Sequence, residues 1–405
     1  MTEQTNLVPK RRFKEFQNTN TSAWEQREFS ELVTRVSISS EEDELPRIEY
    51  EDVVSGQGVL NKDIIAKESE KKGIEFVAGD TLFGKLRPYL QNWLLPDFKG
   101  IAVGDWWVLR PNGMDSKFIY NLIQCSKYQT VANLSTGTKM PRSDWKIVST
   151  TEFAVPTDKA EQAKIGELFS TLDHLITLHQ RKLEKMKALK SAYLSEMFPV
   201  EGEREPKRRF AGFTGAWEQR KLGEIGKTQS GIGFPDIEQG GKDGVPFFKV
   251  SDMNNNGNEY EMLNANNYVS VEQIRRKSWK PIETVPAAIF AKVGAAIMLN
   301  RKRLVRNPFL IDNNTMAYIF DESWDVDFGR ILFETIYLPR FAQVGALPSY
   351  NGSDVEGIKI FVPTLDEQKK IGIFFKELDN TIALHQRKLE KLQNLKKAYL
   401  NEMFV

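Results

Sequence analysis

The chain has 405 residues, of which 40% are hydrophobic and 27% charged, a composition that predicts a globular protein of two or three domains. Lysine and arginine number 56 against 55 for aspartate and glutamate, so the net charge of +1 indicates no overall attraction to a polyanion. Nucleic-acid binding would therefore depend on local basic patches. The single cysteine, Cys125, excludes an internal disulfide and a cysteine-based zinc site, and it fits a reducing compartment.

No apolar run approaches the roughly 20 residues that span a bilayer, and the opening Met1-Thr2-Glu3-Gln4 lacks the apolar segment of a signal peptide. We therefore expect a cytoplasmic protein without a membrane partner.

A long internal repeat sets the organisation of the chain. Residues 161–198 and 367–404 are identical at about 25 of 38 positions without a gap. A shorter repeat precedes them, because Pro9-Lys10-Arg11-Arg12-Phe13 returns at residues 206–210 and Ala23-Trp24-Glu25-Gln26-Arg27 returns at 216–220. The expected segments are an N-terminal arm at residues 1–23, a variable domain at 24–155, a helical spacer at 156–200, a linker at 201–216, a second variable domain at 217–362 and a second helical spacer at 363–405.

The first variable region carries short runs of strand type, such as residues 101–103 and 106–109, a turn signal at Asn112-Gly113 and a helical pattern at 116–128. These features predict a compact α+β domain with many loops. Basic and aromatic side chains gather in two stretches of it, and arginine and lysine bind phosphates and guanine edges. The candidate DNA-binding residues here are Lys85, Arg87, Tyr89, Thr138, Lys139 and Arg142.

The two shared segments are predicted to be long amphipathic helices. Each is free of proline and places apolar residues at steps of three and four, interrupted only by Lys190 and Lys396. Because one exposed helix of this length could not cover its apolar stripe, we expect the two to pack against each other, antiparallel about a pseudo-twofold axis. That register would bring the two central histidines close together, although both could equally be half-exposed seam residues. The predicted seam includes Leu172, His179, Leu183, Leu378, His385 and Leu389.

The second variable region has strand-type runs at residues 245–250 and 358–362, turn signals at Asn256-Gly257 and Asn351-Gly352, and a helical pattern at 328–337. Short fragments align with the first region. Leu82-Phe83-Gly84-Lys85 matches Ile289-Phe290-Ala291-Lys292, Met140-Pro141 matches Leu347-Pro348, and residues 153–157 match 360–364. These matches indicate one fold whose surfaces have diverged. The candidate DNA-binding residues here are Lys292, Arg301, Lys302, Arg303, Ser349, Tyr350 and Asn351.

The sequence contains no recognisable catalytic motif. Asn307-Pro308-Phe309-Leu310 falls short of the Asn/Asp-Pro-Pro-Tyr motif of amino-methyltransferases, and Gly226-Lys227-Thr228 lacks the leading glycine of a phosphate-binding loop. Neither a dinucleotide-binding fingerprint nor a nucleophile elbow is present. The three histidines, His174 among them, have no carboxylate or cysteine spaced to complete a metal site. We expect a non-catalytic chain.

Two variable domains alternating with two near-identical helices resemble the specificity (S) subunit of type I restriction–modification enzymes. The resemblance covers essentially the whole chain and is most specific at residues 363–372, at their counterpart 156–166, and at the two Ala-Trp-Glu-Gln-Arg segments. The first copy holds one extra residue at 158–160, and its arm before Trp24 is longer than the one before Trp217. Neither departure touches the helices.

The resemblance implies an α+β fold of two target recognition domains separated by two long antiparallel helices. Each domain would recognise one half of a split, asymmetric double-stranded DNA sequence. The helices would set the spacing and dock two modification (methyltransferase) subunits, and restriction subunits with helicase and nuclease activity would join the complex. S-adenosylmethionine, ATP and magnesium would then belong to those partners, and this chain would carry no cofactor.

Two other functions remain open at the level of sequence. A coiled-coil adaptor with repeated α+β domains would bind proteins only, so changing Lys85 and Lys292 to alanine would have no effect on DNA binding. A stand-alone methyltransferase or nuclease would need the motifs that the sequence lacks.

Overall fold

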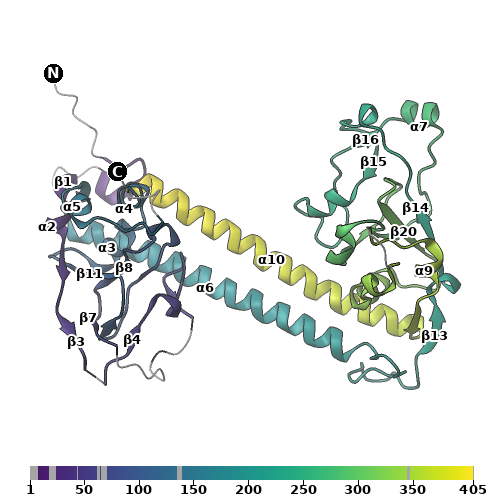
Figure 1. The fold of residues 1–405 in the computed structure, drawn as a ribbon, viewed down its shortest axis with the longest axis horizontal. Helices are drawn as coiled ribbons and strands as arrows, with labels where there is room; N and C mark the ends of the chain where they lie inside the picture. Colours follow the sequence, from purple (N-terminus) through teal and green to yellow (C-terminus); the bar gives the residue numbers. More distant parts are fainter. Residues whose placement is uncertain are drawn as a thin grey trace. The chain divides into compact units, whose positions relative to one another are not determined.

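The computed structural model describes residues 8–17, 24–42, 44–61, 64, 71–134, 139–343 and 347–404. The chain divides into two compact units, each of which contains one variable region and part of both long helices. Unit 1 comprises residues Met1–Lys182 and His385–Val405, and unit 2 comprises Leu183–Leu384. Figure 1 shows the elements of each unit.

Unit 1 contains three small sheets and a separate two-stranded hairpin. Its main sheet is antiparallel in the order β2-β11-β8-β9, a second has the order β3-β7-β10-β4 with β10 and β4 parallel, and the pair β1-β12 closes the domain at its two chain ends. The strands are β1 (Trp24–Glu28), β2 (Val33–Val36), β3 (Ser39–Ser40), β4 (Arg47–Ile48), β7 (Gly73–Phe76), β8 (Thr81–Gly84), β9 (Trp93–Leu94), β10 (Gly100–Ala102), β11 (Trp106–Pro111) and β12 (Glu152–Pro156), with a hairpin of β5 (Val53–Val54) and β6 (Val59–Leu60). The short helices are α1 (Lys14–Gln17), α2 (Phe29–Leu32), η1 (Tyr50–Asp52), η2 (Pro88–Leu90), α3 (Ser116–Leu122), α4 (Ser126–Ala132) and α5 (Trp145–Ser149).

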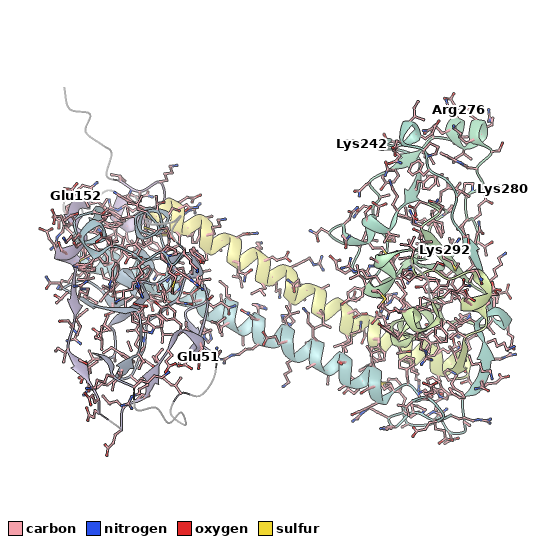
Figure 2. The ribbon with its side chains drawn as sticks, in the orientation of Figure 1. Glu51, Glu152, Lys242, Arg276, Lys280 and Lys292 are labelled. Carbon is pink, nitrogen blue, oxygen red and sulfur yellow. The ribbon has the colours of Figure 1, made fainter. Side chains whose placement is uncertain are left out.

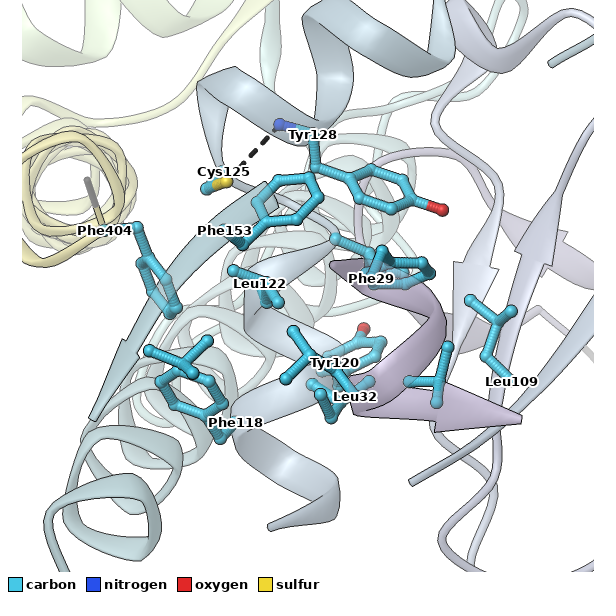
Figure 3. Packing of buried hydrophobic residues seen from close by; sticks show 14 of the residues in the cluster. Phe29, Leu32, Leu109, Phe118, Tyr120, Leu122, Cys125, Tyr128, Phe153 and Phe404 are labelled. Atoms are coloured by element: carbon cyan, nitrogen blue, oxygen red, sulfur yellow. Dashed lines mark hydrogen bonds between the residues drawn. The ribbon is translucent and has the colours of Figure 1, made fainter. Parts of the chain in front are cut away.

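The expected helix at 116–128 is in fact two helices. Asp115 caps α3 by accepting a hydrogen bond from Phe118 N. The helix is then interrupted before α4, where the Cys125 sulfur accepts a hydrogen bond from Tyr128 N at 3.5 Å (Figure 3). The break turns Tyr128 onto Phe29, with ring centroids 5.1 Å apart in the middle of the core. One continuous helix would point Tyr128 elsewhere, so packing of a large aromatic residue explains the difference.

Unit 2 repeats this plan with different strand lengths. Its main sheet has the order β14-β20-β17-β18, a second has the order β16-β15-β19 with β15 and β19 parallel, and β13-β21 closes the domain. The strands are β13 (Glu218–Lys221), β14 (Gly226–Ser230), β15 (Val245–Phe248), β16 (Tyr268–Val269), β17 (Ala287–Ala291), β18 (Lys302–Val305), β19 (Leu310–Ile311), β20 (Thr315–Phe320) and β21 (Lys359–Val362). The short helices are η3 (Leu222–Glu224), η4 (Asp236–Glu238), η5 (Val250–Asn254), α7 (Val271–Lys277), η6 (Ala295–Leu299), α8 (Val326–Thr335), η7 (Leu338–Phe341) and α9 (Gly352–Glu356).

The predicted strands and the helix near 328–337 are confirmed, but one turn prediction is wrong. Asn351-Gly352 begins helix α9, because the Asn351 side chain accepts a hydrogen bond from Asp354 N as an N-cap. An asparagine before a glycine favours a turn and an N-cap for the same reason, since its short amide bonds to nearby backbone.

The shared segments form α6 (Lys159–Glu196) and α10 (Leu365–Met403), as predicted. In unit 1 their contacts run in opposite directions along the two helices: Phe169 contacts Phe404, Asp173 pairs with Lys396, and His179 meets His385. The helices are therefore antiparallel. Within unit 2, Tyr193 of α6 packs on Phe374 of α10 in the same antiparallel sense.

The repeated Glu-Gln-x-Lys-Ile-Gly motif attaches each helix to its own domain. Glu161 is fully buried and accepts two hydrogen bonds from the Arg12 guanidinium, at 2.6 and 2.7 Å, and Glu367 accepts the same pair from Arg209. The next residue, Gln162, bonds to Asp115 N and to Pro156 O, and Gln368 does likewise with Asp325 and Pro363. These bidentate clamps explain why the arm and the helix start repeat together.

Candidate nucleic-acid interface

Two loops of unit 1 are joined so that the predicted basic residues lie side by side. Backbone bonds link Arg87 N to Pro141 O at 2.7 Å and Ser143 N to Lys85 O at 2.8 Å, so residues 85–91 and 139–143 form one loop pair. The five described candidates of unit 1, namely Lys85, Arg87, Tyr89, Lys139 and Arg142, all lie on it.

Unit 2 builds the same loop pair from other residues. Gly294 N bonds to Pro348 O at 2.8 Å and Tyr350 N bonds to Lys292 O at 3.3 Å, which reproduces both links of unit 1 at equivalent positions. The short match of Lys85 with Lys292 in the sequence therefore corresponds to a shared structure. We call residues 85–91 with 139–143 the first loop pair and residues 292–300 with 347–350 the second loop pair.

The first loop pair presents positive charge with a local counterion. The Asp105 carboxylate forms an ion pair with the Arg142 guanidinium at 3.0 Å and lies 3.6 Å from the Lys85 ammonium. Arg87, Tyr89 and Lys139 are exposed. Thr138 lies outside the described residues. Asp105 pairs with two of the four cations of the loop pair, Lys85 and Arg142. One negative charge against four positive ones leaves the loop pair net positive.

On the second loop pair, the Lys292 ammonium donates to Ser230 Oγ at 3.1 Å (Figure 2 labels Lys292). Arg301, the residue that follows the loop 292–300, bonds to the Asn254 side chain. Ser349 is half-buried and its backbone bridges to Val293. This loop pair carries fewer cations than the first, so the two units offer different surfaces on one backbone.

Four candidates of unit 2 are buried or already bonded within the protein. The Lys302 ammonium bonds to Ile336 O at 2.6 Å, and burial lowers its pKa to about 7. Burial also lowers the pKa of Arg303, whose guanidinium bonds to backbone at Lys302. Tyr350 is buried, which raises its pKa to about 12, and the Asn351 amide oxygen caps α9. Lys302 and Arg303 are half-buried and Asn351 is exposed, so of the four only Tyr350 is buried.

Sequence reasoning did not select the apolar residues at the tips of both loop pairs. Leu90 and Met140 are exposed on the first, and Met298, Leu299 and Leu347 on the second. The sequence does contain a sign of these residues, because hydrophobic side chains stand between polar neighbours in a loop. Loops normally expose few large hydrophobic side chains.

The helix seam lies where the sequence placed it. Leu172, Leu183, Leu378 and Leu389 are buried. His179 Nδ1 stands 2.9 Å from His385 Nδ1, and burial, then the charges on His385 and nearby lysines, lowers the pKa of His179. Within the described residues, no group of three or more His, Cys, Asp or Glu side chains could hold a metal ion.

A search of the described helices for one long and apolar enough to cross a bilayer found none.

Comparisons with known proteins agree with this architecture. A specificity subunit of the type I restriction enzyme MjaVIII from Methanocaldococcus jannaschii is 23% identical over 296 residues, which is 71% of this chain and 69% of that protein. The crystal structure of a type I restriction–modification S subunit from M. genitalium has the same fold, with a TM-score of 0.65, 15% identity and coverage of 98% and 99% of the two chains. A chain from a structural study of complex assembly and conformational transition in the type I restriction–modification system gives 0.51, at 18% identity over 93% and 96%.

The family model for the type I restriction modification DNA specificity domain matches twice, at residues 45–188 and 215–394. Each match spans most of one variable region and much of the helix that follows it. The chain therefore belongs to the DNA specificity subunits of type I restriction–modification systems.

Proposed function

We propose that each variable domain recognises one half of a bipartite, asymmetric DNA target, with residues 24–155 responsible for one half and 217–362 for the other. The observation that carries this proposal is the pair of equivalent loop pairs, alike in backbone links and different in side chains. Two different recognition surfaces on one scaffold give a target that is not a palindrome.

The cations of the loop pairs, together with Arg301 next to the second, are the proposed DNA contacts. Lys85, Arg87, Lys139 and Arg142 serve the first half-site and Lys292 and Arg301 the second, with Tyr89 and Ser349 beside them. Lysine and arginine position a protein on phosphates, and arginine also bonds to guanine edges in the major groove. The ion pair with Asp105 restricts the Arg142 side chain before DNA binds, so less conformational entropy is lost on binding.

The helices are the proposed spacer and docking surface for two modification subunits. At ~1.5 Å per residue, α6 and α10 each measure roughly 57 Å, long enough to separate half-sites by about one turn of DNA, ~34 Å. Leu178 and Leu384 occupy equivalent positions on the two helices and are exposed next to the histidines, so they are candidates for contact with a partner.

As a specificity subunit the chain is a non-catalytic part of its complex, and the cofactors reside in partner subunits. Within the proposal, two modification subunits bring S-adenosylmethionine, and restriction subunits bring ATP and magnesium chemistry. Such a complex works on chromosomal DNA in the bacterial cytoplasm.

Methylation mapping after domain exchange tests the proposal. Residues 217–362 are replaced with the corresponding domain of another family member, the complex is expressed with its modification subunits, and methylated adenines are mapped across the genome. We expect one half of the target to change while the other half and the spacing stay. The matched exchange of residues 24–155 must change the opposite half. If either exchange rewrote both halves, or if neither altered methylation, the division of labour would be wrong.

A further inference from the structure

The tips of both loop pairs share an apolar character that the basic residues do not explain. In the first, Tyr89, Leu90 and Met140 are 53%, 40% and 51% exposed, and in the second, Met298, Leu299 and Leu347 are 59%, 57% and 60% exposed. A single exposed hydrophobic residue is ordinary, but three together on each of two equivalent loop pairs form a repeated feature.

Each tip is built on a 3-10 turn with a buried first or middle residue. Each loop contains a 3-10 turn closed by an amide residue in the left-handed conformation, Gln91 with φ 57° and Asn300 with φ 51°. Counting back from that residue, Leu90 and Tyr89 correspond to Leu299 and Met298, and the residue before them is buried in both units, Pro88 in one and Ile297 in the other. The buried anchor presents the two residues that follow it to solvent.

The second loop of each pair adds its apolar residue at the same place. Pro141 and Pro348 accept the backbone bonds that join the loops, and Met140 and Leu347 immediately precede them. A Cβ built on Gly294, where the 3-10 turn begins, would lie 3.8 Å from Leu347 Cδ1, so Leu347 covers the start of the turn.

We propose that these six residues are wedges that insert against the base stack and locally unstack the DNA, one set in each half-site. The inference rests on the proposed function, which places DNA on these loops. Apolar side chains that enter between base steps unstack and kink a duplex, and the apolar faces of the bases replace water as their neighbours. Aromatic residues such as Tyr89 stack on an exposed base face.

The charges around the tips favour DNA over a protein partner as the occupant. Arg87 and Lys139 are exposed beside the first tip, and Lys292 with Arg301 lies beside the second. Cations beside an apolar centre match phosphates beside base faces, because the cations bind phosphate while the apolar centre meets the bases.

Fluorescence of base analogues tests the wedges in the complex with modification subunits. The probe is a duplex of the mapped target with 2-aminopurine at each adenine of one half-site except the methylated one, or pyrrolocytosine at its cytosines. Both analogues brighten on unstacking. The variant carries Met298→Ala, Leu299→Ala and Leu347→Ala, and the control is Ile237→Ala, a more exposed apolar residue of unit 2 on η4, away from the loops.

The wild-type complex and the Ile237→Ala control should both brighten at one or two positions of the half-site recognised by unit 2. The triple variant should lose most of that signal and bind on the order of tenfold more weakly, with the other half-site unaffected. Its salt dependence should stay unchanged, whereas Lys292→Ala should lower the slope by about one and keep the signal at saturation.

No brightening by the wild type, or brightening that survives the triple variant, would overturn the wedges. They would also be overturned if the variant lost its modification subunits and kept its DNA signal, since the tips would then be a protein contact. Domain exchange separates this outcome from failure of the proposed function. An exchange that rewrites one half-site while the probes stay dark defeats the wedges alone.

Discussion

The two units hold the same ion pair between their helices and surround it differently. In unit 1, Lys396 of α10 pairs with Asp173 of α6 at 2.7 Å, and in unit 2, Lys190 of α6 pairs with Asp379 of α10 at 2.8 Å. The lysines are equivalent by the repeat, and so are the aspartates. These are the two lysines that interrupt the apolar seam, and each lies opposite an aspartate of the other helix.

The neighbours come from the variable domains. In unit 2, Arg330 bonds to Asp379 at 2.6 Å and to Glu334 at 2.7 Å, and the ring of Tyr260 covers both cations. In unit 1, Lys396 also donates to Gln124 at 2.8 Å, and the site borders a cavity of about 450 Å³ that is lined by glutamines, Trp93 and Lys397. Both units therefore keep this ion pair between the helices, while the side chains around it differ between the two domains.

The largest expected effect concerns what the units share. Arg209→Ala and Arg12→Ala each leave a fully buried glutamate without its cation, which costs about 3–5 kcal/mol of unfolding free energy. Arg209→Ala should cost more, because Glu161 retains a bond from Trp24 Nε1 at 3.3 Å, whereas the described residues give Trp217 Nε1 no partner. Denaturant unfolding of the full chain measures both.

Arg209→Lys is the matched control for this clamp. It keeps the charge and loses the two-pronged geometry, so its cost should lie between those of the wild type and Arg209→Ala. Equal stability of all three would show that the clamp contributes nothing.

The next effect concerns how the units differ. Lys396→Met should destabilise the chain by about 1–3 kcal/mol, and Lys190→Met by roughly 1 kcal/mol less, because Arg330 still neutralises Asp379 in unit 2. Thermal unfolding of the two variants side by side measures the difference. A Lys190→Met variant as unstable as Lys396→Met would mean that Arg330 does not compensate.

The pH dependence of Lys396→Met has a defined sign. Burial raises the pKa of Asp173 above 3.8, and Lys396 opposes the rise. Without the lysine the folded-state pKa rises further, so the folded variant binds protons more tightly than the unfolded chain. Its deficit should therefore be small below pH 4 and grow as the pH rises through the folded-state value. A deficit that is flat with pH would contradict this account.

The repeat made the helices and their register predictable, because a single pseudo-twofold operation relates residues such as His179 and His385. Lys190 and Lys396 were visible as interruptions of the seam. Their surroundings were not, because Gln124 and Arg330 come from variable domains that have no equivalent chemistry at these positions.

Within the candidate site, the sequence showed where cations gather but not which way they point. Lys302 and Arg303 are adjacent on strand β18, so their side chains leave opposite faces, and both are half-buried with their cationic groups bonded to backbone carbonyl oxygens. Tyr350 lies in the second loop pair, yet its ring is buried, with its centroid 6.2 Å from that of the Phe290 ring. Orientation at such positions depends on distant packing that no local pattern contains.

The next effect is smaller and is a gain in the free energy of unfolding, expected when unit 1 is made to resemble unit 2. Gln124→Glu places a carboxylate beside Lys396, where Glu334 lies beside Lys190. The expected gain is about 0.5–1 kcal/mol at pH 7, limited because a pair that borders an open cavity is screened by solvent. In the double variant with Lys396→Met the gain must vanish or reverse, because the two carboxylates would then repel. A gain that persists without the lysine would mean that the new carboxylate acts elsewhere.

The smallest effect tests the histidine pair of unit 1. The pKa of His179 is lowered in the folded chain, so its neutral form stabilises the fold above pH 6.5 and that stability is lost as the pH falls below this value. Protonation of both rings would place two cations in contact, beside Lys182 and Lys388. His179→Gln should therefore reduce the drop in Tm between pH 7.5 and pH 5.5, whereas His174→Gln, an exposed residue on the same helix, should leave it unchanged. An equal drop in all three proteins would show that protonation of His179, in its 2.9 Å contact with His385, does not contribute to the loss of stability at low pH.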